Sequence, residues 1–134
     1  MSVLALTFVV LFFGANQAHA APICVTKWSE LPQLKPINGI SDFDTKVRNG
    51  SIQFKMPSGK TFTIRERSGN IYAETPEGNA DIQLCKEKGN NKQLTAIANT
   101  ILGKKVIVVH NTGGKKFQII DQGKPNEPVT ATVM

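Results

Sequence analysis

The chain has 134 residues, of which 40% are hydrophobic and 19% are charged, and its formal net charge at pH 7 is +6. This length fits one domain with a modest core. The chain has two cysteines and, beyond residue 20, a single histidine at position 110. So small a set of nitrogen and sulfur ligands argues against a zinc site.

Residues 1–20 have the pattern of a secretory signal peptide. Val3–Phe13 is a short apolar run, and Ala18-His19-Ala20 supplies small residues in an A-x-A cleavage pattern, although no Lys or Arg precedes the run. The run is too short to span a bilayer, and no other segment approaches membrane length. A buried N-terminal strand or helix is the alternative. We predict that the mature chain begins at Ala21, lacks a transmembrane segment and is secreted or periplasmic.

Residues 21–43 are predicted to form an N-terminal arm. Three prolines, at positions 22, 32 and 36, exclude a long helix or a central strand. Trp28 is expected to pack against the body of the domain, with an exposed contact to a ligand as the alternative. Cys24 lies in this arm, and an oxidising compartment favours a Cys24–Cys85 disulfide. That bond would close a loop of roughly 60 residues and stabilise the fold by about 4 kcal/mol.

The stretch from Asp44 to Lys86 is predicted to be an antiparallel β-meander. Asn49-Gly50 is a strong hairpin signal, and it predicts a first hairpin of strands 45–48 and 51–56. Further strands are predicted at 60–66, 70–74 and 81–86. In the last of these Leu84 faces the core, so Cys85 faces away from it. The arm is therefore expected to lie over the outer surface of the sheet or across a barrel end.

Beyond residue 90 the apolar spacing changes. Apolar residues at i, i+3, i+4, i+7 and i+8 predict an amphipathic helix near 92–102, ended by Gly103: Leu94, Ile97, Ala98, Ile101 and Leu102. Strands are predicted at 105–110, 116–121 and 129–133. The fold class is mainly β (β-rich α+β). We expect a small antiparallel β-barrel or sandwich of seven to eight short strands, with one helix, over residues 44–134.

Basic charge is concentrated in residues 86–116, which carry seven lysines and one glutamate. Four of these lysines flank the predicted strand 105–110 and form a candidate anion-binding group: Lys104, Lys105, Lys115 and Lys116. The two pairs should lie at opposite ends of that strand, with the first pair approaching Asp121. Candidate partners are an anionic polymer, a lipid headgroup or an acidic protein surface, and solubilising charge is the alternative. The split and the lack of interleaved aromatics argue against a nucleic-acid groove.

A second candidate site is a pocket rim formed by Glu66 and Lys86, which continue the inward-facing parity of their strands. An ion pair or two extended side chains at the sheet edge are the alternative. His110 is the one neutral-pH candidate for a catalytic base, and its position at the end of an apolar strand favours a structural role. The sequence predicts neither catalytic residues nor a cofactor.

These features favour a non-enzymatic exported binding protein that contacts an anionic envelope component or a protein partner. A carrier of a small apolar ligand inside a barrel is the competing hypothesis. A secreted enzyme inhibitor is a third, since bacterial inhibitors of lysozyme are similar in size and compartment, without a shared motif. The net charge of +6 argues against that target because lysozymes are commonly basic.

Overall fold

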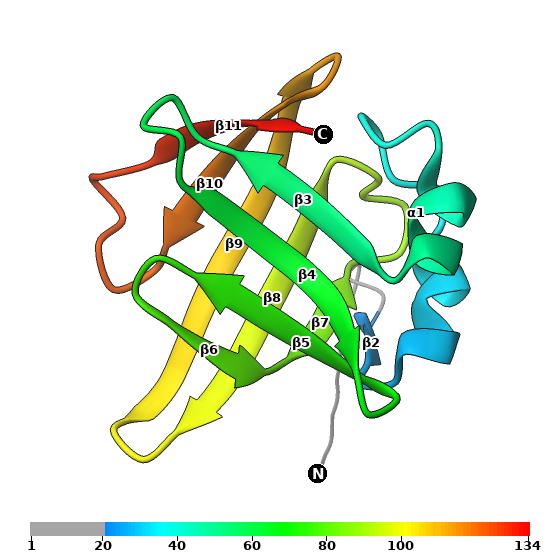
Figure 1. Cartoon of the computed structure of the whole chain (residues 1–134), viewed down its shortest axis with the longest axis horizontal. Helices are drawn as coiled ribbons and strands as arrows, with labels where there is room; N and C mark the ends of the chain where they lie inside the picture. Colours follow the sequence, from blue (N-terminus) through cyan, green and yellow to red (C-terminus); the bar gives the residue numbers. More distant parts are fainter. Residues whose placement is uncertain (1–20) are drawn as a thin grey trace, which may run out of the picture.

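The computed structural model describes residues 21–134, and the predicted signal peptide lies outside the described residues. Within that part, ten antiparallel strands form one sheet accompanied by two short helices (Figure 1). The β-rich α+β class predicted from the sequence is confirmed. No helix among residues 21–134 is long and apolar enough to cross a membrane.

The elements follow one another along the chain as β2 (Ile23–Val25), η2 (Trp28–Leu34), α1 (Phe43–Asn49), β3 (Ser51–Lys55), β4 (Thr61–Arg67), β5 (Asn70–Thr75), β6 (Gly78–Asp81), β7 (Gln83–Lys86), β8 (Gln93–Thr100), β9 (Gly103–Gly113), β10 (Lys116–Asp121) and β11 (Val129–Val133). Across the sheet their order is β2-β7-β8-β9-β10-β11-β3-β4-β5-β6. Only Ile82 separates β6 from β7 in the chain. In the sheet, however, β6 is the last strand of the order, and β7 is the second strand from the other end. The sheet therefore curls back toward itself without closing.

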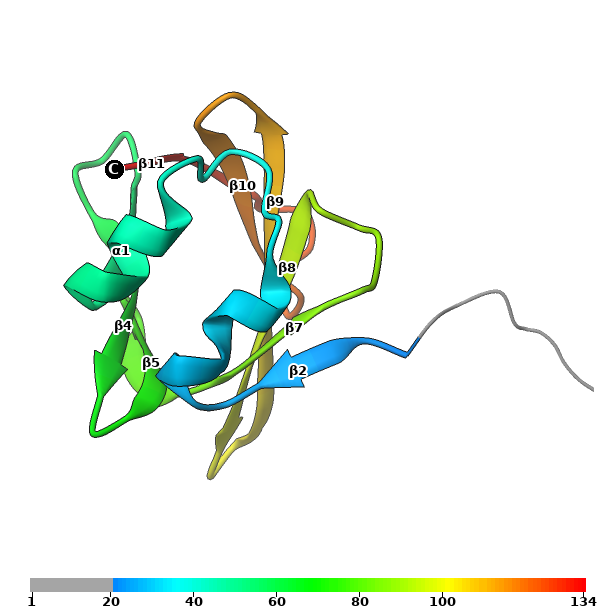
Figure 2. The same ribbon diagram turned by 90° about the vertical axis from the view of Figure 1, so that its right-hand side faces the viewer.

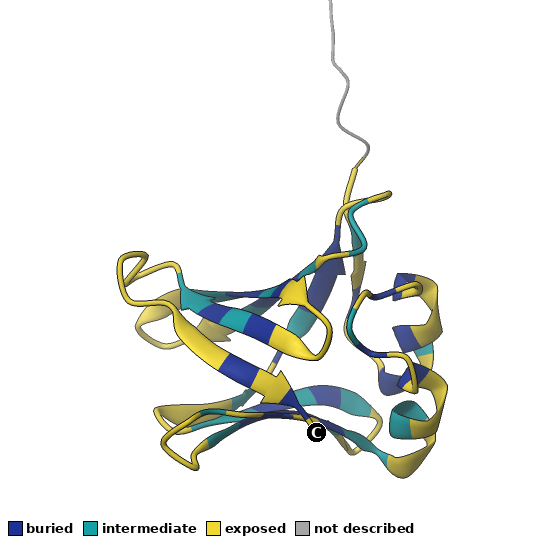
Figure 3. Cartoon of the chain, turned by 90° about the horizontal axis from the view of Figure 1, so that it is seen from above, coloured by how far each residue is buried: buried dark blue, intermediate teal, exposed yellow. Residues whose placement is uncertain are grey.

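The two helices lie at one end of the curled sheet, and the β5–β6 and β8–β9 turns lie at the other (Figure 1). Figure 2 shows both helices at the end of the sheet that faces the viewer, with α1 over β4 and η2 between β5 and β7. The turns β5–β6 and β8–β9 lie far from them (Figures 1 and 3). We call these regions the helix end and the open end.

The N-terminal arm supplies part of the core at the helix end. Trp28 is buried, and its Nε1 donates a hydrogen bond to the carbonyl of Val47 in α1 at 2.8 Å. Leu31 and Leu34 of η2 are fully buried. The predicted packing of Trp28 against the domain is confirmed.

The start of the arm enters the sheet as an edge strand, so its predicted position over the outer surface is wrong, whereas η2 lies at one end of the curled sheet, the other predicted position (Figure 2). β2 pairs with β7 antiparallel, and Cys24 stands directly opposite Cys85. The predicted disulfide between them is confirmed. Val25 and Leu84, the next pair in register, are both buried in the core. The disulfide therefore lies on the other face, as parity predicted, and it joins two adjacent strands.

The predicted helix near 92–102 is wrong, because this segment is strand β8 and the turn after it. Leu94, Ala96 and Ala98 are buried at every second position, and β8 pairs with β9 along its whole length. Ile101 and Leu102 occupy the turn, and both are fully exposed. The helical spacing arose by adding these two turn residues to an alternating strand.

The first predicted strand, 45–48, is also wrong, because it lies in helix α1. Gly50 follows that helix with φ of +83°, and its N–H donates to the carbonyls of Lys46 and Val47. Asn-Gly suits a type I′ turn because glycine adopts positive φ without strain, and a helix end has the same requirement. The dipeptide did not distinguish the two structures.

Candidate functional site

A cavity of about 150 Å³ lies at the open end, between the β5–β6 and β8–β9 hairpins. Apolar side chains form most of its wall: Phe62, Ala73, Ala80, Ile82, Ala96, Ala98 and Ile107, with Thr75, Glu77, Gly78, Asn79, Thr100 and Lys105 toward the turns. A neighbouring cavity of about 160 Å³ extends toward β10 and the loop before β11. The two share Phe62, Thr75, Glu77 and Ile107, so they form one site, which we call the end cavity.

The size of the inward-facing side chains explains why the interior is unfilled here. The strands that approach the open end carry alanine at consecutive inward positions, Ala96 and Ala98 in β8 and Ala73 in β5. At the helix end, Leu31 and Leu34 of η2 fill the equivalent space. Alanine in place of a larger aliphatic residue removes the atoms that would pack across the interior.

The end cavity also lies where the sheet fails to close. β8 pairs with β7 only through Thr95, Ala96 and Ile97, while β9 continues along it to Thr100. β6 is the last strand of the sheet and pairs only with β5. β6 and the end of β8 thus border the cavity as neighbours without a ladder between them.

Charged side chains form a network at the rim of the end cavity. Lys105 Nζ lies 2.9 Å from Glu77 Oε1 and 3.1 Å from Asp121 Oδ2. Lys124 Nζ lies 3.8 Å from Glu77 Oε2. Glu127 also lines the second cavity. Three carboxylates therefore face two ammonium groups, and the rim has no surplus of positive charge.

The contacts of the rim network favour the charged forms of Glu77, Lys105 and Asp121. The hydrogen bond from Lys105 lowers the pKa of Glu77, and the same bond raises the pKa of Lys105. The pKa of Asp121 is lowered first by the Gly123 N–H and then by Lys105. These groups are partly exposed, so each pair contributes at most about 1 kcal/mol to stability.

Each half of the end cavity is small, at about 150 and 160 Å³, and this limits what either half can hold. An apolar protein cavity of about 150 Å³ is large enough for a benzene ring. Drug-sized ligands occupy pockets of roughly 300 to 1,000 Å³. With an apolar wall and a rim whose charges already pair with one another, the site suits a small uncharged ring or a short hydrocarbon chain.

The structure divides the four candidate lysines as the sequence predicted. Lys105 reaches Asp121, whereas Lys115 and Lys116 lie at the β9–β10 turn. β9 separates the two pairs by about 30 Å at 3.3 Å per residue. Lys105 is held by two carboxylates, whereas Lys104, the other member of this pair, is exposed. The group is thus not one continuous patch.

The two candidate rim residues lie away from the end cavity. Glu66 is exposed, and its Oε2 accepts a hydrogen bond from the Gly69 N–H at 2.6 Å. Lys86 is buried in the helix end, where its Nζ donates to the carbonyls of Leu34 and Pro36 at 2.9 and 2.6 Å. Neither residue lines either half of the end cavity.

His110 lies in a neutral setting. Its Nδ1 is 3.2 Å from Gln93 Oε1, and its other strand neighbour in register is Gln118. Among residues 21–134, no group of three or more His, Cys, Asp or Glu side chains is placed to hold a metal ion. The observed surroundings fit a structural side chain.

Sequence reasoning missed the residues of the end cavity. The feature that could have indicated the cavity is the presence of alanine at successive inward-facing positions of one strand. It can be recognised only once residues 93–100 are identified as a strand. No known protein family matches the chain, and neither does any curated protein or solved structure.

Proposed function

We propose that this chain is an exported, non-enzymatic binding protein that holds a small uncharged apolar group in the end cavity. The observation that carries the proposal is an apolar space of about 150 Å³ that opens where the end of β8 has no ladder to β6. The chemical class is an aromatic ring or a short hydrocarbon chain. This is the carrier hypothesis raised by the sequence, with its site moved from Glu66 and Lys86 to the opposite end.

Two further features support the proposal. The rim network pairs its charges internally, so it offers no free cation for an anionic ligand. The Cys24–Cys85 disulfide indicates an oxidising environment, which agrees with the predicted signal peptide and with a secreted or periplasmic location.

The first prediction concerns affinity for straight-chain alcohols from propanol to octanol, measured by NMR chemical-shift titration of the mature chain. Each added methylene group should raise the affinity about fourfold until the cavity is full, because each buries one more apolar group. The shifted amides should be those of the cavity wall, above all Ala96 and Ala98. Titrations without saturation, or shifts spread evenly over the surface, would count against the proposal.

The matched pair of variants is Ala98→Leu, which fills the cavity, and Thr132→Leu, which adds the same side chain at an exposed position of β11. Ala98→Leu should abolish alcohol binding while changing the free energy of unfolding by less than about 1 kcal/mol, because the new atoms enter an existing void. Thr132→Leu should bind like the wild type. Equal binding by both variants would place the alcohols elsewhere and overturn the assignment.

A further inference from the structure

The tip of the β8–β9 hairpin exposes two large aliphatic side chains. Ile101 is 103% exposed and Leu102 is 96% exposed. The other exposed large hydrophobic residues of the described chain, Val129 and Met134, are only about half exposed at 40% and 53%. Two adjacent, fully exposed aliphatic residues at the extremity of a protein have no role in its core.

A second turn in the same molecule shows that the fold does not require them. Thr75-Pro76-Glu77-Gly78 and Thr100-Ile101-Leu102-Gly103 share a T-x-x-G pattern. In each turn the threonine Oγ1 donates to the glycine carbonyl, at 2.7 and 2.6 Å. In each, it also accepts from the N–H two residues on, at 3.1 and 3.2 Å. The same geometry is made with Pro-Glu in one turn and Ile-Leu in the other.

The aliphatic tip stands beside the mouth of the end cavity. Thr100 and Lys105, on the two sides of the tip, both line the cavity, and so do Thr75 and Gly78 of the other turn. Both turns lie at the end of the molecule opposite the helices (Figures 1 and 3). Whatever the tip touches is therefore brought close to the cavity mouth.

We propose that Ile101 and Leu102 insert into the surface of a lipid bilayer and so place the end cavity at the boundary of the hydrocarbon region. A bilayer accepts a convex tip without a complementary pocket. Lys104 beside the tip is exposed, the nearby carboxylates Glu77 and Asp121 are paired with Lys105, and the chain has a net charge of +6. Such charges favour anionic lipid.

This inference rests on the proposed function and names the source of its ligand. An apolar group that leaves the hydrocarbon region beside the tip would meet the apolar wall of the end cavity. Two aliphatic side chains bury little area compared with an acyl anchor, and one myristoyl chain already gives only reversible binding. We therefore expect weak, reversible association that increases with the content of anionic lipid.

The test is co-sedimentation of the mature chain with vesicles of phosphatidylethanolamine and phosphatidylglycerol, and with vesicles of phosphatidylcholine alone. The informative variant is Ile101→Pro with Leu102→Glu, which transplants the residues of the other turn and keeps its hydrogen bonds. It should lose vesicle binding about tenfold or more, because both buried side chains are removed. Lys104→Gln should weaken binding severalfold on the anionic vesicles alone.

Leu102→Trp gives a direct readout of depth. Its fluorescence should shift to shorter wavelength and be quenched by brominated lipid, against the constant background of buried Trp28. The inference is overturned if wild type and the Pro-Glu variant sediment equally. It is also overturned if the tip drives self-association in sedimentation velocity without any binding to vesicles, since the tip would then be a protein contact.

The two proposals fail in different ways. The Pro-Glu variant should still bind alcohols, because neither tip residue lines the end cavity. Ala98→Leu should still sediment with vesicles. Loss of vesicle binding with intact alcohol binding, and the reverse, assign the two properties to separate parts of the open end. If the Pro-Glu variant loses both, the tip acts through the cavity and the lipid inference is rejected.

Discussion

Replacing both cysteines, Cys24→Ala with Cys85→Ala, is expected to lower the free energy of unfolding by about 4 kcal/mol. The bond joins residues 61 positions apart, and a cross-link of that length removes about this much loop entropy from the unfolded chain. For a domain of this size the midpoint of thermal unfolding should fall by about 15 °C. Urea denaturation of the oxidised wild type and the double variant measures the difference.

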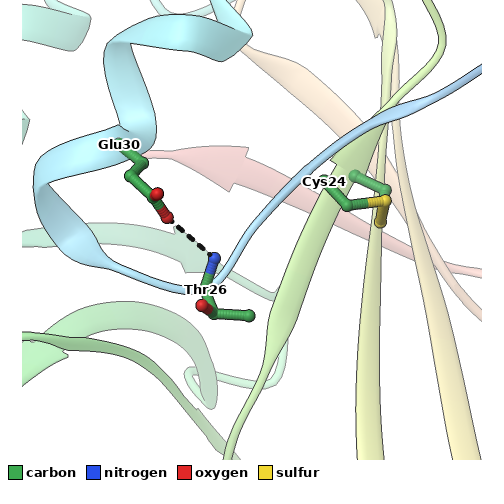
Figure 4. The surroundings of a disulfide bond; sticks show 4 residues. Cys24, Thr26 and Glu30 are labelled. Atoms are coloured by element: carbon green, nitrogen blue, oxygen red, sulfur yellow. Dashed lines mark hydrogen bonds between the residues drawn. A yellow bond between two sulfur atoms is a disulfide. The ribbon is translucent and has the colours of Figure 1, made fainter.

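The disulfide should matter more than its surroundings because β2 is only three residues long. Beyond β2, Glu30 Oε1 accepts a hydrogen bond from the N–H of Thr26 at 3.3 Å (Figure 4) and another from the N–H of Lys27 at 3.1 Å. The Thr26 carbonyl accepts from the Ile71 N–H, and the Trp28 N–H donates to the Gly69 carbonyl, both at 2.9 Å. None of these contacts ties the arm to β7. Wild type under reducing conditions should behave like the double variant. A loss below about 1 kcal/mol would mean that the buried side chains of η2 hold the arm unaided.

Alternation identified the strands that bury one face, because burial at every second residue is what a one-sided sheet requires. Ile52 and Phe54 in β3 and Phe117 and Ile119 in β10 are examples. β8 has the same burial pattern, but its inward residues include alanines, which also favour a helix. The exposed Ile101 then completed a false helical period. Periodicity predicts secondary structure only where aliphatic residues are buried, and Ile101 and Leu102 are exposed.

The rim network contains one contact that the pairing of neighbouring strands predicts and one that it does not. Pairing between adjacent strands β9 and β10 brings Lys105 to Asp121, and the sequence predicted that approach from the hairpin alone. Glu77 reaches the same lysine from the β5–β6 turn, and β5 and β6 are not adjacent to β9 in the sheet. That contact depends on the curl of the whole sheet. The end cavity was missed for the same reason.

For Lys86 the sequence predicted the correct face of the strand but the wrong contacts. The sequence placed it on the inward face, and it is indeed only 5% exposed. The expected partner was solvent or Glu66 at a pocket rim. Because the arm folds inward at the helix end, Lys86 instead donates to two backbone carbonyls of the arm. The prolines predicted that the arm is irregular. Carbonyl groups in an irregular segment lack the partners that a helix or sheet would give them, and here the buried Lys86 donates to two of them.

Lys86→Met is expected to lower the free energy of unfolding by about 2 kcal/mol at neutral pH. The variant keeps the apolar length of the side chain but leaves the buried carbonyl of Leu34 without this donor, at about 1 to 3 kcal/mol, and the part-buried carbonyl of Pro36 at a smaller cost. Relief from burying a charge offsets part of that loss, since the structure gives Lys86 no salt bridge within residues 21–134. Lys88→Met, at an exposed position nearby, is the control and should be neutral.

The same variant has a distinctive pH dependence. Burial lowers the pKa of Lys86 below its ordinary value of 10.5, so the unfolded chain binds more protons between the folded pKa and 10.5. The free energy of unfolding contributed by this residue therefore rises with pH in that window, by at most about 1.4 kcal/mol per pH unit. The difference between wild type and Lys86→Met should grow as the pH approaches 10.5. A difference that stays constant would mean that the lysine remains charged without penalty.

Lys86 and Cys85 hold the same arm from opposite faces of β7. Cys85 bonds to β2 on the outer face, and Lys86 donates to the segment after η2 on the inner face. If the folded arm detaches when the disulfide is absent, the two carbonyls are hydrated and Lys86→Met has little left to remove. Combining all three substitutions should then lower the free energy of unfolding by clearly less than the sum of the separate losses, as coupled sites require. Full additivity in urea denaturation would show that the arm stays docked without the disulfide, which then acts on the unfolded chain alone.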